Sequence, residues 1–320
     1  MKYLLLTEGS AFFPELLKPF ERAGLYNWMK AFEGEVRLWS DIGRRPQDFG
    51  HYDIIHVNSH GEDQGLAHKV SKYTDNSDTK LVVNPDLSID YFDKELDLVN
   101  FIRDVLAADM LFGVEPTQVN LINYIAHVMG RKKPKKAVLM PHPINITQFL
   151  DDTFIEYDKR MDIVAFQYHK YDGHWAIPKM LMEALPNEYF SAMLGYMSMP
   201  LPMEGLRHMV MPYMEWNLYI KFLSRCKIGF EYRTHKAASR FVMEAGALGL
   251  PVVSTTDSHM GQIVFSEICH PVEDFAGIRR SLEHLCTDDE WRHHLAREGI
   301  DRLGPYSFEN SKERFMEALE

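Results

Sequence analysis

The stretch from Phe230 to Thr255 constrains the fold more than any other part of the chain. It follows an apolar run typical of a buried strand, and then enters a polar loop. Ser239 can cap a helix whose apolar residues recur at helical spacing, and Gly249 and Pro251 can end it before a second apolar strand. Strand, helix and strand in so short a span form a right-handed βαβ unit. Ligands of such units lie beyond the carboxyl ends of the strands, which predicts a phosphate site near Thr234 to Arg240.

Strands and helices also alternate along the rest of the chain, which predicts open parallel sheets covered on both faces. At 320 residues the chain exceeds the usual size of one domain, about 100–200 residues. A charged stretch without periodicity, Asp151 to Lys159, is the best candidate for a linker. We therefore expect two α/β domains with Rossmann-like parallel sheets facing each other across a cleft, over residues 1–152 and 153–305, followed by a helix within 306–320.

Charge and cysteine usage restrict the partners and the setting. The net charge of -11 argues against a protein that coats nucleic acid or anionic lipid. Three widely spaced cysteines, Cys226, Cys269 and Cys286, are typical of reduced thiols in a cytoplasmic protein. No apolar stretch approaches the roughly 20 residues of a membrane span. We expect a soluble, cytoplasmic protein that is at most peripheral to a membrane.

One strongly basic run stands out from this acidic background. Anionic lipid attracts such a run, so weak contact with a membrane surface is one interpretation, and contact with a phosphate-bearing acceptor is another. A solvated turn between a helix and a strand is the more ordinary one. The run consists of Arg131, Lys132, Lys133, Lys135 and Lys136.

Residues Phe241 to Ser254, read as FVMEAGALGLPVVS, resemble the donor-site helix and the following strand of GT-B glycosyltransferases, particularly glycosyltransferase family 4. Four further segments resemble that family in the same order along the chain. Asp53 to Val57 resembles its N-domain strand, Met140 to Phe149 its interdomain segment, Tyr219 to Phe230 the helix and strand before the donor loop, and Tyr306 to Asn310 the start of its C-terminal helix. The resemblance covers most of the chain and is densest in the C-terminal half.

This resemblance implies a GT-B fold with an acceptor-side N-terminal domain, a nucleotide-sugar domain and a terminal helix that crosses back to the first domain. It implies a glycosyltransferase that moves a sugar from a nucleotide-diphosphate sugar to an acceptor hydroxyl, with retention of configuration and without a metal. We expect no cofactor besides the nucleotide sugar, which is a substrate. No Asp-x-Asp pair occurs in the chain, and the adjacent His293 and His294 would point apart on a helix.

The donor-binding residues of the family transfer only in part. Glu244 matches the glutamate that the family uses to hold the ribose hydroxyls, although a solvent-facing helix residue is the ordinary alternative. A second glutamate is expected at position 236, which is Lys236 here. Glu231 lies nearby but out of register.

Four cations are available to neutralise a diphosphate. Lys236 and Arg240 are four residues apart at the helix entry and can share a face, where fixed positive charge would stabilise the departing nucleotide. An ordinary basic loop is the alternative for each of them. The four are Lys236, Arg240, His169 and Lys170.

The acceptor side has weaker candidates. His56 and His60 lie at the end of a predicted strand, Asp53 to Ser59, and Asp86 follows the next one. A side chain there can bind the acceptor or assist proton transfer, and we treat all three as catalytic candidates. A lone histidine is more often a packed or exposed bystander.

Two alternatives to a transferase stay open. The replacement of the expected acid by Lys236 fits a catalytically degenerate GT-B protein that binds nucleotide or glycan in a regulatory role. A nucleotide-sugar epimerase of the same fold is a further alternative, but its acidic and histidine pattern is not seen. The base, the sugar, the acceptor and the oligomeric state do not follow from the sequence.

Overall fold

The computed structural model describes the chain apart from residues 9–23, 43–45, 76, 86–96, 130–136, 168–175, 184, 195–207 and 212–213, and apart from the side chains of 46, 62 and 152. The chain forms two compact units, one of residues 1–143 with 306–320 and one of residues 144–305. Each unit contains a six-stranded sheet. Every pairing between named neighbouring strands is parallel, so the predicted α/β class is confirmed.

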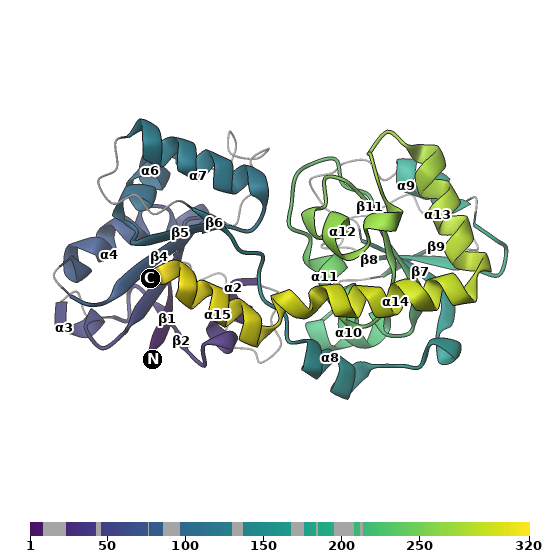
Figure 1. Cartoon of the computed structure of the whole chain (residues 1–320), viewed down its shortest axis with the longest axis horizontal. Coiled ribbons are helices and arrows are strands. Elements are labelled where there is room, and N and C mark those ends of the chain that lie inside the picture. The colour runs from purple at the N-terminus through teal and green to yellow at the C-terminus, as the bar shows by residue number, and fades with distance from the viewer. Residues whose placement is uncertain are drawn as a thin grey trace. The chain divides into compact units, whose positions relative to one another are not determined.

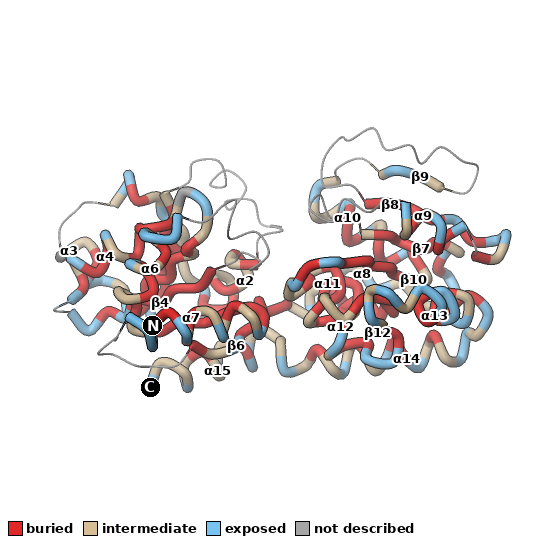
Figure 2. The backbone as a smooth tube through the Cα atoms, turned by 90° about the horizontal axis from the view of Figure 1, so that it is seen from above, coloured by how far each residue is buried: buried red, intermediate tan, exposed pale blue. Residues whose placement is uncertain are grey.

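The sheet of the first unit has the strand order β2-β1-β3-β4-β5-β6. Its strands are β1 (Tyr3–Thr7), β2 (Glu35–Leu38), β3 (Ile54–Asn58), β4 (Lys80–Asn84), β5 (Met110–Gly113) and β6 (Val138–Leu139). The described helices are α2 (Gly24–Ala31), α3 (Pro46–Phe49), α4 (Leu66–Thr74), α6 (Leu98–Ala107), α7 (Pro116–Val128) and α15 (Phe308–Leu319). The inner strands are apolar runs because both of their faces are covered, and Figure 2 shows them buried.

The last helix, α15, is part of the first unit and lies beside α2 (Figure 1). Phe315 of α15 is fully buried, and its ring centroid lies 5.2 Å from that of Trp28 and 4.9 Å from that of Phe32. Phe112 of β5 and Tyr3 of β1 close the same aromatic cluster, at 6.1 and 6.4 Å from Phe315. The end of the chain thus supplies part of the core of the first unit.

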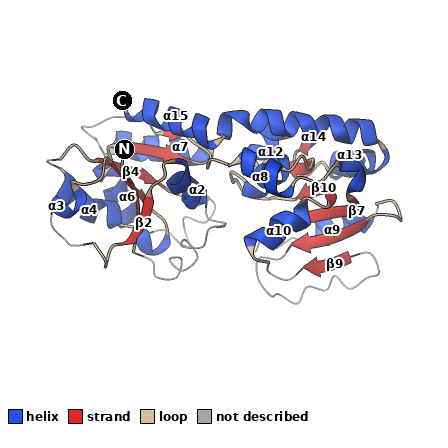
Figure 3. Ribbon diagram, turned by 90° about the horizontal axis from the view of Figure 1, so that it is seen from below, coloured by secondary structure: helices blue, strands red, loops and turns tan. Residues whose placement is uncertain are grey.

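The sheet of the second unit has the strand order β12-β11-β10-β7-β8-β9. Its strands are β7 (Met161–Gln167), β8 (Phe190–Leu194), β9 (His208–Met211), β10 (Cys226–Glu231), β11 (Val252–Thr255) and β12 (Cys269–His270). The described helices are α8 (Ile146–Thr153), α9 (Ala176–Glu183), α10 (Trp216–Leu223), α11 (Arg240–Ala247), α12 (His259–Val264), α13 (Phe275–Thr287) and α14 (Asp289–Leu303). The long helix α14 packs against α11, α12 and α13, and Figure 3 shows α12 and α13 beside it.

The predicted βαβ unit is confirmed. Strands β10 and β11 are parallel neighbours, and α11 connects them. The Ser239 hydroxyl accepts a hydrogen bond from the Val242 amide at 3.3 Å, which caps the start of α11. Gly249 follows the helix with φ +63°, the left-handed conformation that favours glycine at this position.

One predicted strand is wrong. The sequence predicts a strand over Ser266 to Cys269, but Ser266–Ile268 forms a 3-10 turn and the strand begins only at Cys269. Arg302 of α14 explains the turn, because its guanidinium donates to the Glu267 carboxylate at 2.7 Å and to the Val264 carbonyl at 3.2 Å. This pairing spans more than thirty residues and leaves no local pattern.

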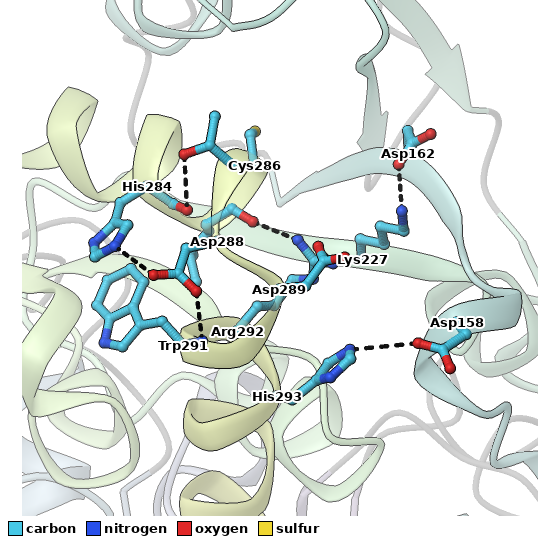
Figure 4. A network of polar contacts seen from close by, with 12 residues as sticks. Asp158, Asp162, Lys227, His284, Cys286, Asp288, Asp289, Trp291, Arg292 and His293 are labelled. Carbon is cyan, nitrogen blue, oxygen red and sulfur yellow. Dashed lines mark hydrogen bonds and ion pairs between the residues drawn. The ribbon is translucent and has the colours of Figure 1, made fainter.

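A polar network occupies the junction of α13 and α14 (Figure 4). Asp288 caps α14 through the Trp291 amide at 2.9 Å, and Arg292 donates to the Leu285 carbonyl at 2.6 Å. Nearby, Lys227 pairs with Asp162 at 2.5 Å near the amino ends of β10 and β7. The first two contacts satisfy backbone groups at the ends of α13 and α14, and the third joins the side chains of two neighbouring strands. No helix in the described part of the chain is long and apolar enough to span a membrane.

Candidate functional site

The loop between β10 and α11, residues 232–239, is held by hydrogen bonds with the last residue of β11 and with the segment that follows it. The Thr255 hydroxyl accepts from the Arg233 amide at 3.0 Å and donates to the Arg233 carbonyl at 2.7 Å. The Ala237 amide donates to the Asp257 carbonyl at 3.0 Å, and the His259 amide donates to the Ala237 carbonyl at 2.8 Å. The loop at the carboxyl end of β10 is therefore preorganised, at the edge of the sheet where ligands of this fold class bind.

Glu244 lies on α11, one turn from its start, with only 7% of its surface exposed. Its Oε1 accepts from Arg240 Nη2 at 2.7 Å and from the indole Nε1 of Trp216 at 3.4 Å. Both of these hydrogen bonds use Oε1, and none from a described residue uses Oε2. The carboxylate is thus held from one side and keeps one oxygen for a ligand, whereas the ordinary interpretation had placed it in solvent.

The two described cations of the predicted diphosphate site each pair with a carboxylate. Lys236 Nζ lies 2.8 Å from Asp257 Oδ1, and its side chain is 47% exposed. Arg240 pairs with Glu244, as above, and its side chain is 25% exposed. Because both cations are partly exposed to solvent, their ion pairs are weak and a diphosphate can exchange for these carboxylates.

A buried polar cluster lies around the same loop as Lys236. Of its members, only Glu231 is predicted from the sequence as a donor-site residue. It consists of Glu231, Arg233, His235 and Ser239, each at most 7% exposed. Glu231 Oε1 accepts from Arg233 Nε and from the Ser239 hydroxyl, both at 2.8 Å. Arg233 Nη1 lies 3.1 Å from His235 Nε2. Since a guanidinium only donates, His235 accepts at Nε2 and carries its proton on Nδ1. The available sequence signal was Glu-x-Arg-x-His directly after an apolar strand.

Ser239 has an unusual backbone. Its φ of +63° is rare for a residue other than glycine, and its side chain is buried. The hydroxyl that accepts from the Val242 amide also donates to Glu231, so the surrounding contacts hold this conformation. The cluster therefore determines how the chain enters α11.

In the first unit, the structure places His56 inside the sheet. It lies within β3 and is fully buried. Its Nε2 lies 2.6 Å from Asn84 Oδ1, and its Nδ1 contacts the Tyr3 hydroxyl. A carbonyl oxygen only accepts, so Nε2 donates and Nδ1 accepts from Tyr3, whose pKa is raised by burial. Both ring nitrogens are engaged across three strands, which matches the packed alternative in the sequence analysis.

His60 lies in the segment after β3 and is half-buried. Two carboxylates fix this segment. Asp63 accepts from the Thr7 hydroxyl at 2.9 Å and from the Glu8 amide at 2.5 Å, which ties it to the end of β1. Asp104 of α6 is fully buried and accepts from Ser59, Gly65 and His68 at 2.7, 2.7 and 2.9 Å. Burial raises the pKa of Asp104.

The remaining predicted residues lie outside the described part of the chain. They are Asp86, His169 and Lys170, together with the basic run of Arg131, Lys132, Lys133, Lys135 and Lys136. Among the described residues, no three His, Cys, Asp or Glu side chains are grouped so that they could hold a metal ion.

Solved structures with the same fold as this chain are found by comparison, although its sequence has no match. No protein-family model matches the chain, and no curated protein matches it. A trehalose-6-phosphate synthase structure superposes with a TM-score of 0.74 at 10% identity, over 100% of this chain and 99% of that one. A sucrose-phosphate synthase from Thermosynechococcus elongatus superposes with a TM-score of 0.66 at 11% identity, over 99% and 98% of the two chains.

An alpha-glucosyltransferase in complex with UDP-glucose and DNA containing an abasic site is also similar. Its TM-score is 0.68 at 13% identity, over 100% of this chain and 99% of that one. The expected resemblance to GT-B glycosyltransferases is confirmed at the level of the fold, while the narrower resemblance to family 4 stays a prediction. The chain has the fold of the GT-B glycosyltransferases, with two Rossmann-like α/β units.

Proposed function

We propose that the protein is a glycosyltransferase that moves a sugar from a nucleotide-diphosphate sugar to an acceptor hydroxyl. The observation that carries the proposal is the Glu244 carboxylate on α11, buried, oriented by Arg240 and Trp216, and with Oε2 available. A carboxylate in this position can accept hydrogen bonds from the hydroxyls of a ribose. Structures of the same fold with UDP-glucose or UDP bound support a nucleotide sugar as the ligand.

The proposed chemistry uses positive potential at the start of α11. Negative charge grows on the nucleoside diphosphate as the bond between sugar and phosphate breaks. The amino end of α11 and the cations Lys236 and Arg240 would stabilise this charge, after Asp257 and Glu244 give up part of their pairing. We propose retention of configuration without a metal, on the resemblance to family 4 alone.

On the acceptor side, we propose that His60 is the candidate in the described part of the chain. It follows β3 in a segment that Asp63 and Asp104 hold in place. His56 instead has a structural role, because both of its ring nitrogens form hydrogen bonds to residues of neighbouring strands within the core. One similar enzyme is complexed with DNA, so the acceptors to test include nucleic acid as well as glycans and sugar phosphates.

A thermal-shift panel tests the donor site. UDP, GDP, ADP and their glucose conjugates are added in excess, and one of them is expected to raise the melting temperature, because ligand at about 100 times its Kd adds about 2.7 kcal/mol of stability. Glu244→Gln should lower the affinity for that ligand about tenfold to a hundredfold, since a buried polar partner of the ligand is lost. No shift with any of the six compounds would contradict the proposal.

The matched control is Glu283→Gln. Glu283 also pairs with an arginine four residues away on a helix of the same unit, at 2.7 Å from Arg279, but on an exposed surface. This variant should bind the nucleotide as the wild type does. Binding followed by no sugar transfer to any acceptor would instead identify the degenerate binding protein.

A further inference from the structure

Among the described cations near the proposed donor site, Arg233 is the most constrained, and no role is predicted for it from the sequence. It lies two residues beyond β10 and is 7% exposed. Thr255 holds both its amide and its carbonyl, Glu231 holds Nε at 2.8 Å, and His235 accepts from Nη1 at 3.1 Å. The hydrogen bonds of the guanidinium to described residues use Nε and Nη1, and none uses the other terminal nitrogen, Nη2.

The pairing with Glu231 differs from that of an arginine buried for stability. A structural pair usually joins two guanidinium donors to the two carboxylate oxygens. Here Glu231 Oε1 serves both Arg233 and Ser239, while Oε2 is buried without a partner among the described residues. Glu231 therefore fixes the guanidinium through Nε alone, which leaves hydrogens on both terminal nitrogens for another acceptor.

His235 adds orientation without adding charge. As an acceptor at Nε2 it is neutral, so it directs one Nη1 hydrogen and does not compete for an anion. Ser239 links the same carboxylate to the capped start of α11. The guanidinium is thus held in one orientation beside a helix amino terminus, where little entropy is lost when a phosphate binds.

We propose that Arg233 binds the diphosphate of the nucleotide sugar, and that Glu231, His235 and Ser239 are its positioning residues. This inference rests on the proposed function and extends it. Lys236 and Arg240 are more exposed and would follow the ligand, whereas Arg233 is already desolvated and in place. A planar guanidinium can donate two parallel hydrogen bonds to one phosphate, which a lysine cannot do.

The test compares two ligands in two variants. The first ligand is whichever of UDP, GDP and ADP stabilises the wild-type protein, and the second is inorganic pyrophosphate, measured by its displacement of the first. Arg233→Gln should lower the affinity for both ligands about tenfold or more, because at least one charge-assisted hydrogen bond is lost. Glu244→Gln should weaken the nucleotide and leave pyrophosphate within about twofold, because pyrophosphate has no ribose.

Controls separate binding from folding. Arg279→Gln removes an exposed arginine from a 2.7 Å pair on α13 and should leave both affinities unchanged. If Arg233→Gln does not fold, the double variant Glu231→Gln/Arg233→Gln carries the test, because it leaves no unpaired charge in the cluster. Nucleotide binding that depends on Glu244 but is unchanged in the Arg233 variant overturns this inference alone. A wild-type protein that binds no nucleotide overturns the proposed function.

Discussion

At the scale of single residues, buried charges decide the local geometry of both units. Asp104 and Glu231 are each at most 1% exposed, and each accepts several hydrogen bonds, Asp104 from Ser59, Gly65 and His68 and Glu231 from two residues of one loop. A carboxylate has room for several donors, so one residue can fix two loops at once. Burying a charged residue costs free energy unless it is hydrogen-bonded. Substituting such a residue should therefore lower the stability of its unit even where no ligand binds.

The substitution Asp104→Asn tests this for the first unit. An amide presents an NH₂ group to one of the three donors now bonded to Asp104, and the variant should lose about 1–3 kcal/mol of stability at neutral pH. Asp97→Asn, an exposed cap of the same helix, is the control and should have a smaller effect. Urea denaturation of the two variants gives the comparison.

The pKa of Asp104 adds a pH dependence with a definite sign. Its folded pKa is raised above the ordinary 3.8 by burial, so the folded state binds this proton more tightly than the unfolded state. This contribution to stability therefore falls as pH rises from about 3.8 through the raised value, and is constant above it. The Asn variant should lack that slope, and an identical slope in both proteins would contradict the role of Asp104.

At the scale of elements, α11 is fixed at both ends by contacts from outside the helix. Ser239 and Glu231 hold its start, and Arg160 holds its end. The Arg160 guanidinium donates to the Leu248 and Gly249 carbonyls at 2.6 and 2.9 Å, and lies 4.6 Å from the centre of the Tyr157 ring. Burial lowers the pKa of Arg160 to about 10, which leaves it charged at neutral pH.

We expect Arg160→Met to destabilise the second unit by about 3 kcal/mol, because two buried helix-end carbonyls lose charged donors. Arg280→Met on the exposed surface of α13 should change stability by at most about 0.5 kcal/mol. Thermal and urea unfolding measure both variants. Equal effects of the two substitutions would show that Arg160 contributes no more than a surface arginine.

At the scale of the whole molecule, the division of the chain into two units does not follow the order of the sequence. Residues 306–320 belong to the first unit although they follow the second in sequence. Phe315 contributes a fully buried ring to an aromatic cluster built from β1, β5, α2 and the residue after α2. The first unit is therefore complete only when residues 306–320 have been synthesised.

The substitution Phe315→Ala should cost the first unit about 3–5 kcal/mol, the usual effect of deleting a buried aromatic ring. Glu317→Ala, exposed on the same helix, should have little effect. Two-unit proteins need not unfold in one step, so limited proteolysis is the better readout, with cleavage expected within residues 1–143 of the Phe315 variant. Cleavage confined to residues 144–305 would count against this assignment.

Local periodicity was enough to predict the parallel α/β class, the βαβ unit around α11 and its caps at Ser239 and Gly249. These features depend on residues that are close together in the sequence, so the local pattern of apolar and capping residues is enough to predict them. The strand predicted at Ser266 failed because Arg302, thirty-six residues later, bonds to that turn. The strand propensity of a short segment does not reflect a contact with a residue so distant in the sequence.

The candidate site divides in the same way. The sequence alone singled out Lys236 and Arg240 by their spacing at a predicted helix entry, and Glu244 by the resemblance of its helix to that of family 4. Only the tertiary structure decided that Lys236 meets Asp257, that His56 is bonded inside the core, and that Arg233 is held between Glu231 and His235. The register of parallel strands brings such side chains together, and register is a property of the folded sheet rather than of neighbouring residues.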